Sequence, residues 1–209
     1  TVISGYLEMI QNSGQVTDEW SVAIEQALYQ TNRMEQIIAD MLKLATIEHD
    51  RHITSSSELI DMPLLLNKMF NDVKNSTNAS DHQFSAQIDS SLRIEGHESE
   101  ITSVCLNLMR NAVIHTPKGT QVHLKWFRGE DQRANLWISD DGDGIDNKHI
   151  PHLTERFYRV DNSRSKNIQS TGLGLAIVKH ICLNHNATFD IESKKGEGTI
   201  FKIQFPYSI

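Results

Sequence analysis

The sequence predicts an α+β protein in two parts, a helical hairpin followed by a sandwich of helices and a sheet. Apolar residues recur at alternating intervals of four and three over residues 18–47, which is the period of a packed helix. Val122, Leu124 and Trp126 alternate with polar residues, which is typical of a half-buried strand. Later helices and strands are joined by hairpins rather than by repeated βαβ units, which favours the α+β class.

Residues 1–51 are predicted to form the helical hairpin. A first helix carries Ile3, Leu7 and Ile10 on one face and is interrupted at residues 12–14. Two helices cannot enclose an apolar seam alone, so we predict a homodimer whose hairpins form a four-helix bundle. Packing of the hairpin against the rest of its own chain is the alternative. The seam of the second helix comprises Trp20, Ile24, Ala27, Thr31, Met34, Ile38, Met41 and Ala45.

A polar stretch at residues 49–58 marks the boundary with a second domain, residues 52–209. Helical patterns in this domain cover residues 62–73, 98–115 and 172–186. Strand patterns cover residues 83–88 and 92–95, followed by those around 122–126 and 136–138. Residues 188–193 and 199–205 flank a glycine-rich turn and are predicted to form a closing hairpin.

Composition excludes several classes of protein. The 209 residues carry a formal charge of −7, which argues against nucleic acid as a partner because phosphate neutralisation needs a basic patch. The chain has neither an apolar run long enough for a transmembrane helix nor a basic secretion signal at its start. It begins with Thr1 rather than Met, so we expect a fragment of a longer protein. Cys105 and Cys182 lie in apolar helical patterns and are predicted to be buried reduced thiols in a cytosolic protein.

Asn107 and Asn111 are four residues apart on a predicted helix, so their side chains share one face. A carboxamide offers an acceptor oxygen and two donors without charge. Mg²⁺ usually keeps several waters and takes oxygens from nucleotide phosphates, so one protein ligand suffices. The pair is therefore a candidate Mg²⁺ and phosphate site, with ordinary surface or capping asparagines as the alternative.

Asp140, Gly142 and Gly144 follow a predicted strand. The glycines permit positive φ angles and close backbone approach to a flat ligand. A carboxylate at the strand end can accept a hydrogen bond from an adenine amino group. A plain glycine-rich turn is the alternative, whereas a calcium loop is excluded because Leu153 stands where the bidentate Glu is needed.

Gly172 and Gly174 open the last predicted helix, where free amides bind phosphate anions. The segment lacks the Gly-Lys-Ser/Thr of a Walker motif. The polar residues 161–171 before it are predicted to form a mobile lid, with a plain loop as the alternative. Four cations lie near this lid, and surface solvation is the alternative role for each: Arg156, Arg159, Arg164 and Lys166. The histidine pairs 149/152 and 180/185 lack zinc-ligand spacing and are interpreted as structural.

Four motifs in this order resemble the N, G1, F and G2 boxes of bacterial sensor histidine kinases. They are Asn107-x-x-x-Asn111, Asp140-x-Gly142-x-Gly144, Arg156-Phe157-Tyr158-Arg159 and Gly172-x-Gly174. Gly196-x-Gly198-Thr199 resembles the last glycine box of that family. The resemblance covers residues from about 57 to the end and implies a Bergerat-type α/β sandwich that binds ATP and Mg²⁺.

The resemblance also implies roles for individual residues. Asn111 would bind Mg²⁺, Asp140 would hold the adenine amino group, and Asn107 would lie near the γ-phosphate. Asn107 and Arg156 are the candidate catalytic residues. The implied nucleotide-binding set also includes His115, Lys118, Gly142, Gly144, Tyr158, Arg159, Gly172, Leu173, Gly174, Leu175 and Thr199.

Residues 1–51 resemble the dimerisation and histidine-phosphotransfer domain of the same family, beginning just after its acceptor stretch. The acceptor histidine would therefore lie upstream of residue 1. Residues 153–161 and 172–180 resemble the phosphate-regulon branch of the family. The resemblance then implies transfer of the γ-phosphoryl group to that histidine, and onward to an aspartate of a cognate response regulator in phosphate-starvation signalling. It also implies attachment to the bacterial inner membrane, only through the missing N-terminal part.

The sequence departs from the family pattern at Asp141, Asp143, Thr154 and Ser170. The two extra carboxylates of the G1 box are expected to weaken binding of an anionic nucleotide, in part offset by Mg²⁺. Two alternatives remain open. One is a pseudokinase that binds nucleotide only to set the shape of a dimer. The other is a related ATPase of the gyrase, chaperone or mismatch-repair kind, which typically has Glu in place of Asn107.

Overall fold

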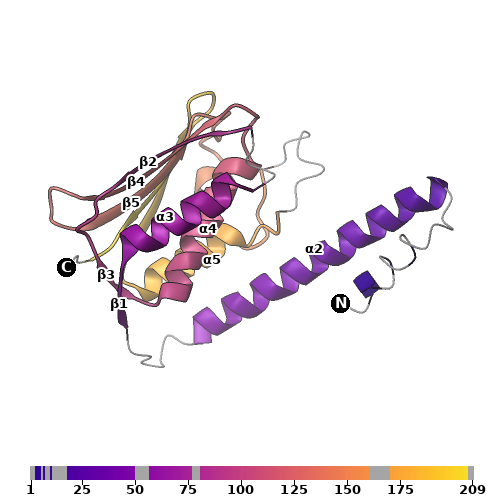
Figure 1. Cartoon of the computed structure of the whole chain (residues 1–209), viewed down its shortest axis with the longest axis horizontal. Coiled ribbons are helices and arrows are strands. Elements are labelled where there is room, and N and C mark those ends of the chain that lie inside the picture. The colour runs from indigo at the N-terminus through magenta and orange to yellow at the C-terminus, as the bar shows by residue number, and fades with distance from the viewer. Residues whose placement is uncertain are drawn as a thin grey trace.

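The computed structural model describes residues 3–5, 7, 10, 18–49, 57–76, 81–160 and 170–206. A long helix, α2 (Asp18–His49), lies beside a sandwich in which three helices cover one face of a sheet (Figure 1). The predicted order, a helical region followed by an α/β sandwich, is confirmed. The expected break at residues 12–14 lies outside the described residues.

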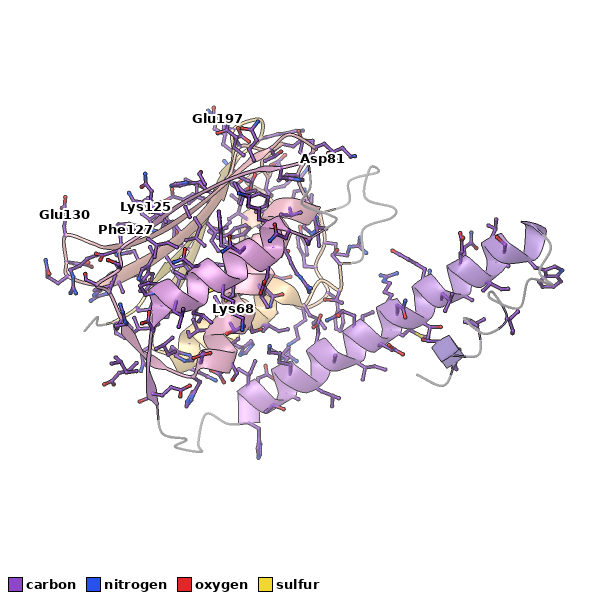
Figure 2. All side chains as sticks on the ribbon, in the orientation of Figure 1. Lys68, Asp81, Lys125, Phe127, Glu130 and Glu197 are labelled. Carbon is purple, nitrogen blue, oxygen red and sulfur yellow. The ribbon has the colours of Figure 1, made fainter. Side chains whose placement is uncertain are left out.

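The sheet has five strands in the order β2 (Gln83–Ile88), β4 (Gln121–Arg128), β5 (Ala134–Asp140), β7 (Gly198–Gln204) and β6 (Thr188–Lys194). β2 pairs with β4 in parallel, and the other neighbours are antiparallel. Val122, Leu124 and Trp126 of β4 are buried and point toward the helices, as their period of two predicts. The turns at Glu130 and Glu197 lie at opposite ends of the sheet (Figure 2).

Helices α3 (Met62–Lys74), α4 (Glu98–Ile114) and α5 (Gly174–Asn184) pack on one face of the sheet (Figure 1). α3 begins where the Asp61 carboxylate accepts a hydrogen bond of 3.1 Å from the Leu64 amide, and Pro63 occupies its first turn. The strand expected at residues 92–95 is the shorter β3 (Ile94–Gly96), which pairs with β1 (Glu58–Ile60). Neither β1 nor the short 3₁₀ helix η3 (Ile150–His152) was predicted from the sequence.

The core lies between the sheet and the three helices. Leu136 and Ile138 of β5 are fully buried there, as is Leu108 of α4. Cys105 and Cys182 are buried free thiols, as predicted, and burial raises the pKa of each to about 12. Both sulfurs therefore behave as small apolar groups that contribute to packing.

Helix α2 docks on the sandwich through its C-terminal end. Leu44 and Ile47 are buried, and the Asn184 side chain at the end of α5 donates a hydrogen bond of 3.0 Å to the Ile47 carbonyl. The Glu48 carboxylate pairs with Arg156 and lies 3.2 Å from the His180 ring. In the described part of the chain, no helix is both long and apolar enough to span a membrane.

The docked face of α2 is not the predicted seam. Ile24 and Thr31 of the seam are buried, whereas Met34 and Ile38 are 53% and 58% exposed. Helix α2 therefore does pack on its own chain, as the alternative predicted, but through a different face, which includes Leu44 and Ile47. The middle of the seam is left open to a partner.

Candidate nucleotide site

A cavity of about 1100 Å³ lies between α2 and the sandwich, at the end of β5 and the beginning of α5. Its size suits a nucleotide, because ligand pockets commonly measure several hundred to about 1,000 Å³. Most of the site residues expected from the sequence line this cavity. They are Asn107, Asn111, His115, Lys118, Asp140, Gly144, Tyr158, Arg159, Gly172, Gly174, Leu175 and Thr199.

Asp140 ends β5 and is only 8% exposed. Its carboxylate accepts hydrogen bonds from the Gly142 amide, at 3.0 Å, and from the Thr199 amide. Burial raises the pKa of Asp140 to about 6, since these two bonds offset only part of the desolvation. The result is a fixed acceptor that can pair with an exocyclic amino group.

The β6–β7 turn holds the loop that follows Asp140. Gly144 has a φ of +61°, and a Cβ there would lie 2.0 Å from the Lys194 carbonyl oxygen. Gly198 has a φ of +91°, and its Cβ would lie 2.0 Å from the Asp140 carbonyl oxygen. The Gly196 amide donates a hydrogen bond of 2.7 Å to the Asp143 carbonyl. The last glycine box therefore positions the G1 loop through close backbone contact.

α4 places the two asparagines on the cavity wall, one turn apart. The Asn107 amide donates to the Ser103 carbonyl at 2.9 Å, and its oxygen faces Gly174, where a Cβ would lie 2.7 Å away. Among the described residues, the Asn111 side chain has no hydrogen-bond partner, so its oxygen is available to a metal ion. Desolvation and the nearby Arg159 charge lower the pKa of His115, which favours a neutral ring on this wall.

The beginning of α5 is fixed from two sides. Gly172 has a φ of +72° and packs on Phe157, whose amide donates to the Gly172 carbonyl at 2.9 Å. The Thr171 hydroxyl accepts a hydrogen bond from the Leu173 amide at 3.2 Å and donates one of 2.8 Å to Asp40 of α2. Free amides of this first turn face the cavity side where a phosphate would bind.

Three of the expected residues do not line the cavity. Arg156 is held by Glu48 on the docked face of α2, so the structure does not bring this catalytic candidate together with Asn107. Gly142 lies beneath Asp140, where a Cβ would meet the Thr116 methyl at 2.6 Å, and Leu173 is fully buried in the core.

Two other parts of the expected site lie at the cavity margin or mostly outside the described residues. Lys118 reaches only the cavity margin, since its side chain is 85% exposed and pairs with Asp81 at 2.7 Å. Of the predicted lid at residues 161–171, residues 161–169 with Arg164 and Lys166 are outside the described residues, whereas Ser170 and Thr171 line the cavity.

One wall of the cavity was not predicted from the sequence. A polar stripe on α2 forms it, made of Tyr29, Asn32, Arg33, Gln36, Asp40 and Lys43. The signal was present in the spacing, since polar residues three or four apart share a helix face. Of the two extra carboxylates, Asp143 lines the cavity, whereas Asp141 accepts the Gln121 amide at 2.7 Å and joins β5 to β4.

Comparison with known proteins assigns both halves of the chain. Residues 96–209 match the profile of the histidine kinase-, DNA gyrase B-, and HSP90-like ATPase family. Residues 1–50 match the His Kinase A (phospho-acceptor) domain. The second match favours the kinases over the gyrase and chaperone branches. The chain belongs to the sensor protein-histidine kinase family.

Relatives within that family point to one branch. The phosphate regulon sensor protein PhoR of Pseudomonas aeruginosa is 38% identical over 206 residues, which is 98% of this chain and 46% of that protein. PhoR of Haemophilus influenzae is 36% identical over 208 residues, or 99% of this chain and 48% of that protein. The chain thus spans about half the length of these relatives. The solved mycobacterial sensor histidine kinase MprB is 26% identical, with a TM-score of 0.63 over 72% of this chain and 97% of that one.

Proposed function

We propose that this chain is the ATP-dependent core of a histidine kinase. It transfers the γ-phosphoryl group of ATP to a histidine upstream of residue 1, and thence to an aspartate of a response regulator. One observation carries the proposal: Asp140 and the Asn107–Asn111 pair share a single cavity whose opposite wall is α2, a helix of the phospho-acceptor domain. The residues proposed to bind adenine and the metal ion thus line one cavity with a helix of the phospho-acceptor domain.

Phosphoryl transfer needs positioning and charge screening more than covalent chemistry by the protein. Asp140 fixes the adenine end, because its carboxylate has further lone pairs beside the two amide bonds, and an adenine amino group buried without an acceptor costs about 1–3 kcal/mol. The amides at the beginning of α5 and the Asn107 side chain orient the phosphates. Asn111 would hold Mg²⁺ through its carboxamide oxygen, and the ion would supply positive charge that offsets the nucleotide phosphates and the carboxylates of the site.

We infer that the response regulator is of the phosphate-starvation type. Two relatives above 35% identity are phosphate regulon sensor proteins, and each aligns with nearly the whole of this chain. Attachment to the bacterial inner membrane would come from parts of the full protein that precede this chain.

The first prediction tests the reaction. With radioactive ATP and Mg²⁺, a chain extended upstream through a histidine-containing acceptor segment is expected to acquire an acid-labile label, while residues 1–209 alone stay unlabelled. Asn111→Ala in the extended chain should abolish Mg²⁺-dependent labelling, because one metal ligand is lost. Metal-free nucleotide binding, measured by calorimetry, should change little in this variant.

Two results would contradict this proposal. A label on residues 1–209 would show that the acceptor lies within the present chain. An equal loss of metal-free and metal-dependent binding in Asn111→Ala would assign Asn111 to packing rather than to the metal.

We also propose that the family's dimer forms through the exposed seam of α2. Met34 and Ile38 lie mid-seam and are more than half exposed in the single chain, on a face distinct from Leu44 and Ile47. An apolar helix face of this length is normally covered. A second copy covers it with the same residues in a symmetric bundle.

The second prediction concerns this dimer. Met34→Glu combined with Ile38→Lys would bury two charges in an apolar seam, and their attraction to each other one turn apart does not repay the cost of removing both from water, so the chain should sediment as a monomer. ATP affinity should persist, because neither residue lines the cavity. Leu64→Glu, a change at an exposed apolar residue of α3, is the matched control and should remain dimeric. An unchanged dimer in the double variant would place the interface elsewhere.

A further inference from the structure

The polar stripe of α2 faces the ATP-binding half of the cavity directly. The contact of 2.8 Å between Asp40 and the Thr171 hydroxyl sets the position of α2 along the cavity. Thr171 immediately precedes the glycines whose amides open α5. Arg33 lies seven residues before Asp40 on the same helix face, which is about 10 Å further along the wall. The stripe therefore extends past the phosphate end of the site.

Four of the five Arg and Lys side chains that line this cavity form no ion pair with the described residues. Outside it, many basic side chains are paired, as in Arg93 with Asp61 at 2.9 Å and Lys202 with Glu192 at 2.5 Å. Lys118, at the cavity margin, is paired with Asp81. The other four have no carboxylate of the described residues within ion-pair distance. These unpaired cations are Arg33, Lys43, Arg110 and Arg159.

Arg33 is distinguished from the other three by a single atom of its guanidinium group. Its Nε atom is buried and has no hydrogen-bond partner in the described structure. A guanidinium nitrogen removed from water without a partner is costly, and buried polar groups are nearly always satisfied. If the Arg33 side chain turned into the cavity that it lines, its guanidinium could pair with an anion there, and the nucleotide brings a triphosphate to this space.

We infer that Arg33 binds a phosphate group of the nucleotide from the side of the phospho-acceptor domain, opposite Asn111. The inference rests on the proposed function and adds a ligand-binding residue to it. A guanidinium offers several donors in a planar fork that matches phosphate oxygens, so it both holds and orients the group. The phosphates would then be held between the two domains, with α5 and α4 on one side and α2 on the other.

The test compares Arg33→Gln with Lys68→Gln in the whole chain by calorimetric titration with ATP plus Mg²⁺ and, separately, with adenosine. Lys68 is an exposed cation on α3, outside the cavity, so its variant controls for net charge (Figure 2). Arg33→Gln is expected to weaken ATP binding about tenfold or more, because a charge-assisted hydrogen bond is lost. Adenosine affinity should be unchanged in both variants. Arg33→Lys should retain part of the ATP affinity, since the charge remains.

The possible results distinguish a failure of the role inferred for Arg33 from a failure of the proposed function. If wild type and Lys68→Gln bind ATP and Arg33→Gln binds it equally well, the role of Arg33 is wrong while the proposed function stands. If Arg33→Gln loses ATP and adenosine to the same extent, the residue is structural and the inference is again wrong. If wild type itself fails to bind ATP, the proposed function fails, and the inference fails with it.

Discussion

Gly198→Ala is expected to lower the free energy of unfolding of the sandwich by about 3 kcal/mol or more. Two causes act together at this position. A side chain at a φ of +91° is strained, and the added Cβ would lie 2.0 Å from the Asp140 carbonyl oxygen. That oxygen belongs to the backbone at the end of β5, which is paired on both sides and cannot move aside cheaply. Urea unfolding followed by circular dichroism measures the loss.

Gly196→Ala is the matched control for this substitution. Gly196 lies in the same turn with a φ of +84°, but nothing lies within 4 Å of its Cβ position. Only the left-handed backbone strain applies, about 1–2 kcal/mol. If both variants unfold at the same urea concentration, the close contact between the turn and Asp140 does not contribute, and the proposed support of the G1 loop is wrong.

Asp140→Ala is expected to weaken ATP binding by about 1–3 kcal/mol, roughly five- to 150-fold, because the adenine amino group loses its buried acceptor. Titration of a fluorescent ATP analogue measures the change. Asp141→Ala is the control, since it removes the same charge from the adjacent residue, whose carboxylate binds the Gln121 amide outside the cavity. Equal ATP affinities in wild type and Asp140→Ala would remove Asp140 from the site.

The same carboxyl group predicts how binding depends on pH. Burial raises the pKa of Asp140 to about 6, above its value in the unfolded chain. The protonated Asp140 carboxyl therefore stabilises the folded state fully below its unfolded pKa, near 4, and this stabilisation is lost as the pH rises through about 6. The adenine amino group donates to the ionised form, so ATP affinity should rise between about pH 5 and pH 7.5. Asp140→Ala should show a flatter profile.

Local chemistry made much of the fold and site predictable. The period of two in β4 predicted a strand with one buried face. The glycines followed by an apolar run at Gly174 predicted the beginning of a buried helix. In both cases the local pattern is enough to indicate what the element packs against. Burial of Cys105 and Cys182 followed from the same reasoning. Strand β1, the partner of β3, was not predicted, because three residues carry too little periodicity to distinguish a strand from a loop.

The sequence by itself determined which groups could bind a nucleotide, because glycines that permit close approach and side chains with the right donors and acceptors are local properties. Only the tertiary structure decided which of them meet. It turned Arg156 toward Glu48, used Asp141 to join two strands, and placed Arg33 and Asp40 of α2 on the cavity wall. A polar side chain on a helix specifies no particular neighbour. Its partner is set by the docking of elements that are distant in the chain.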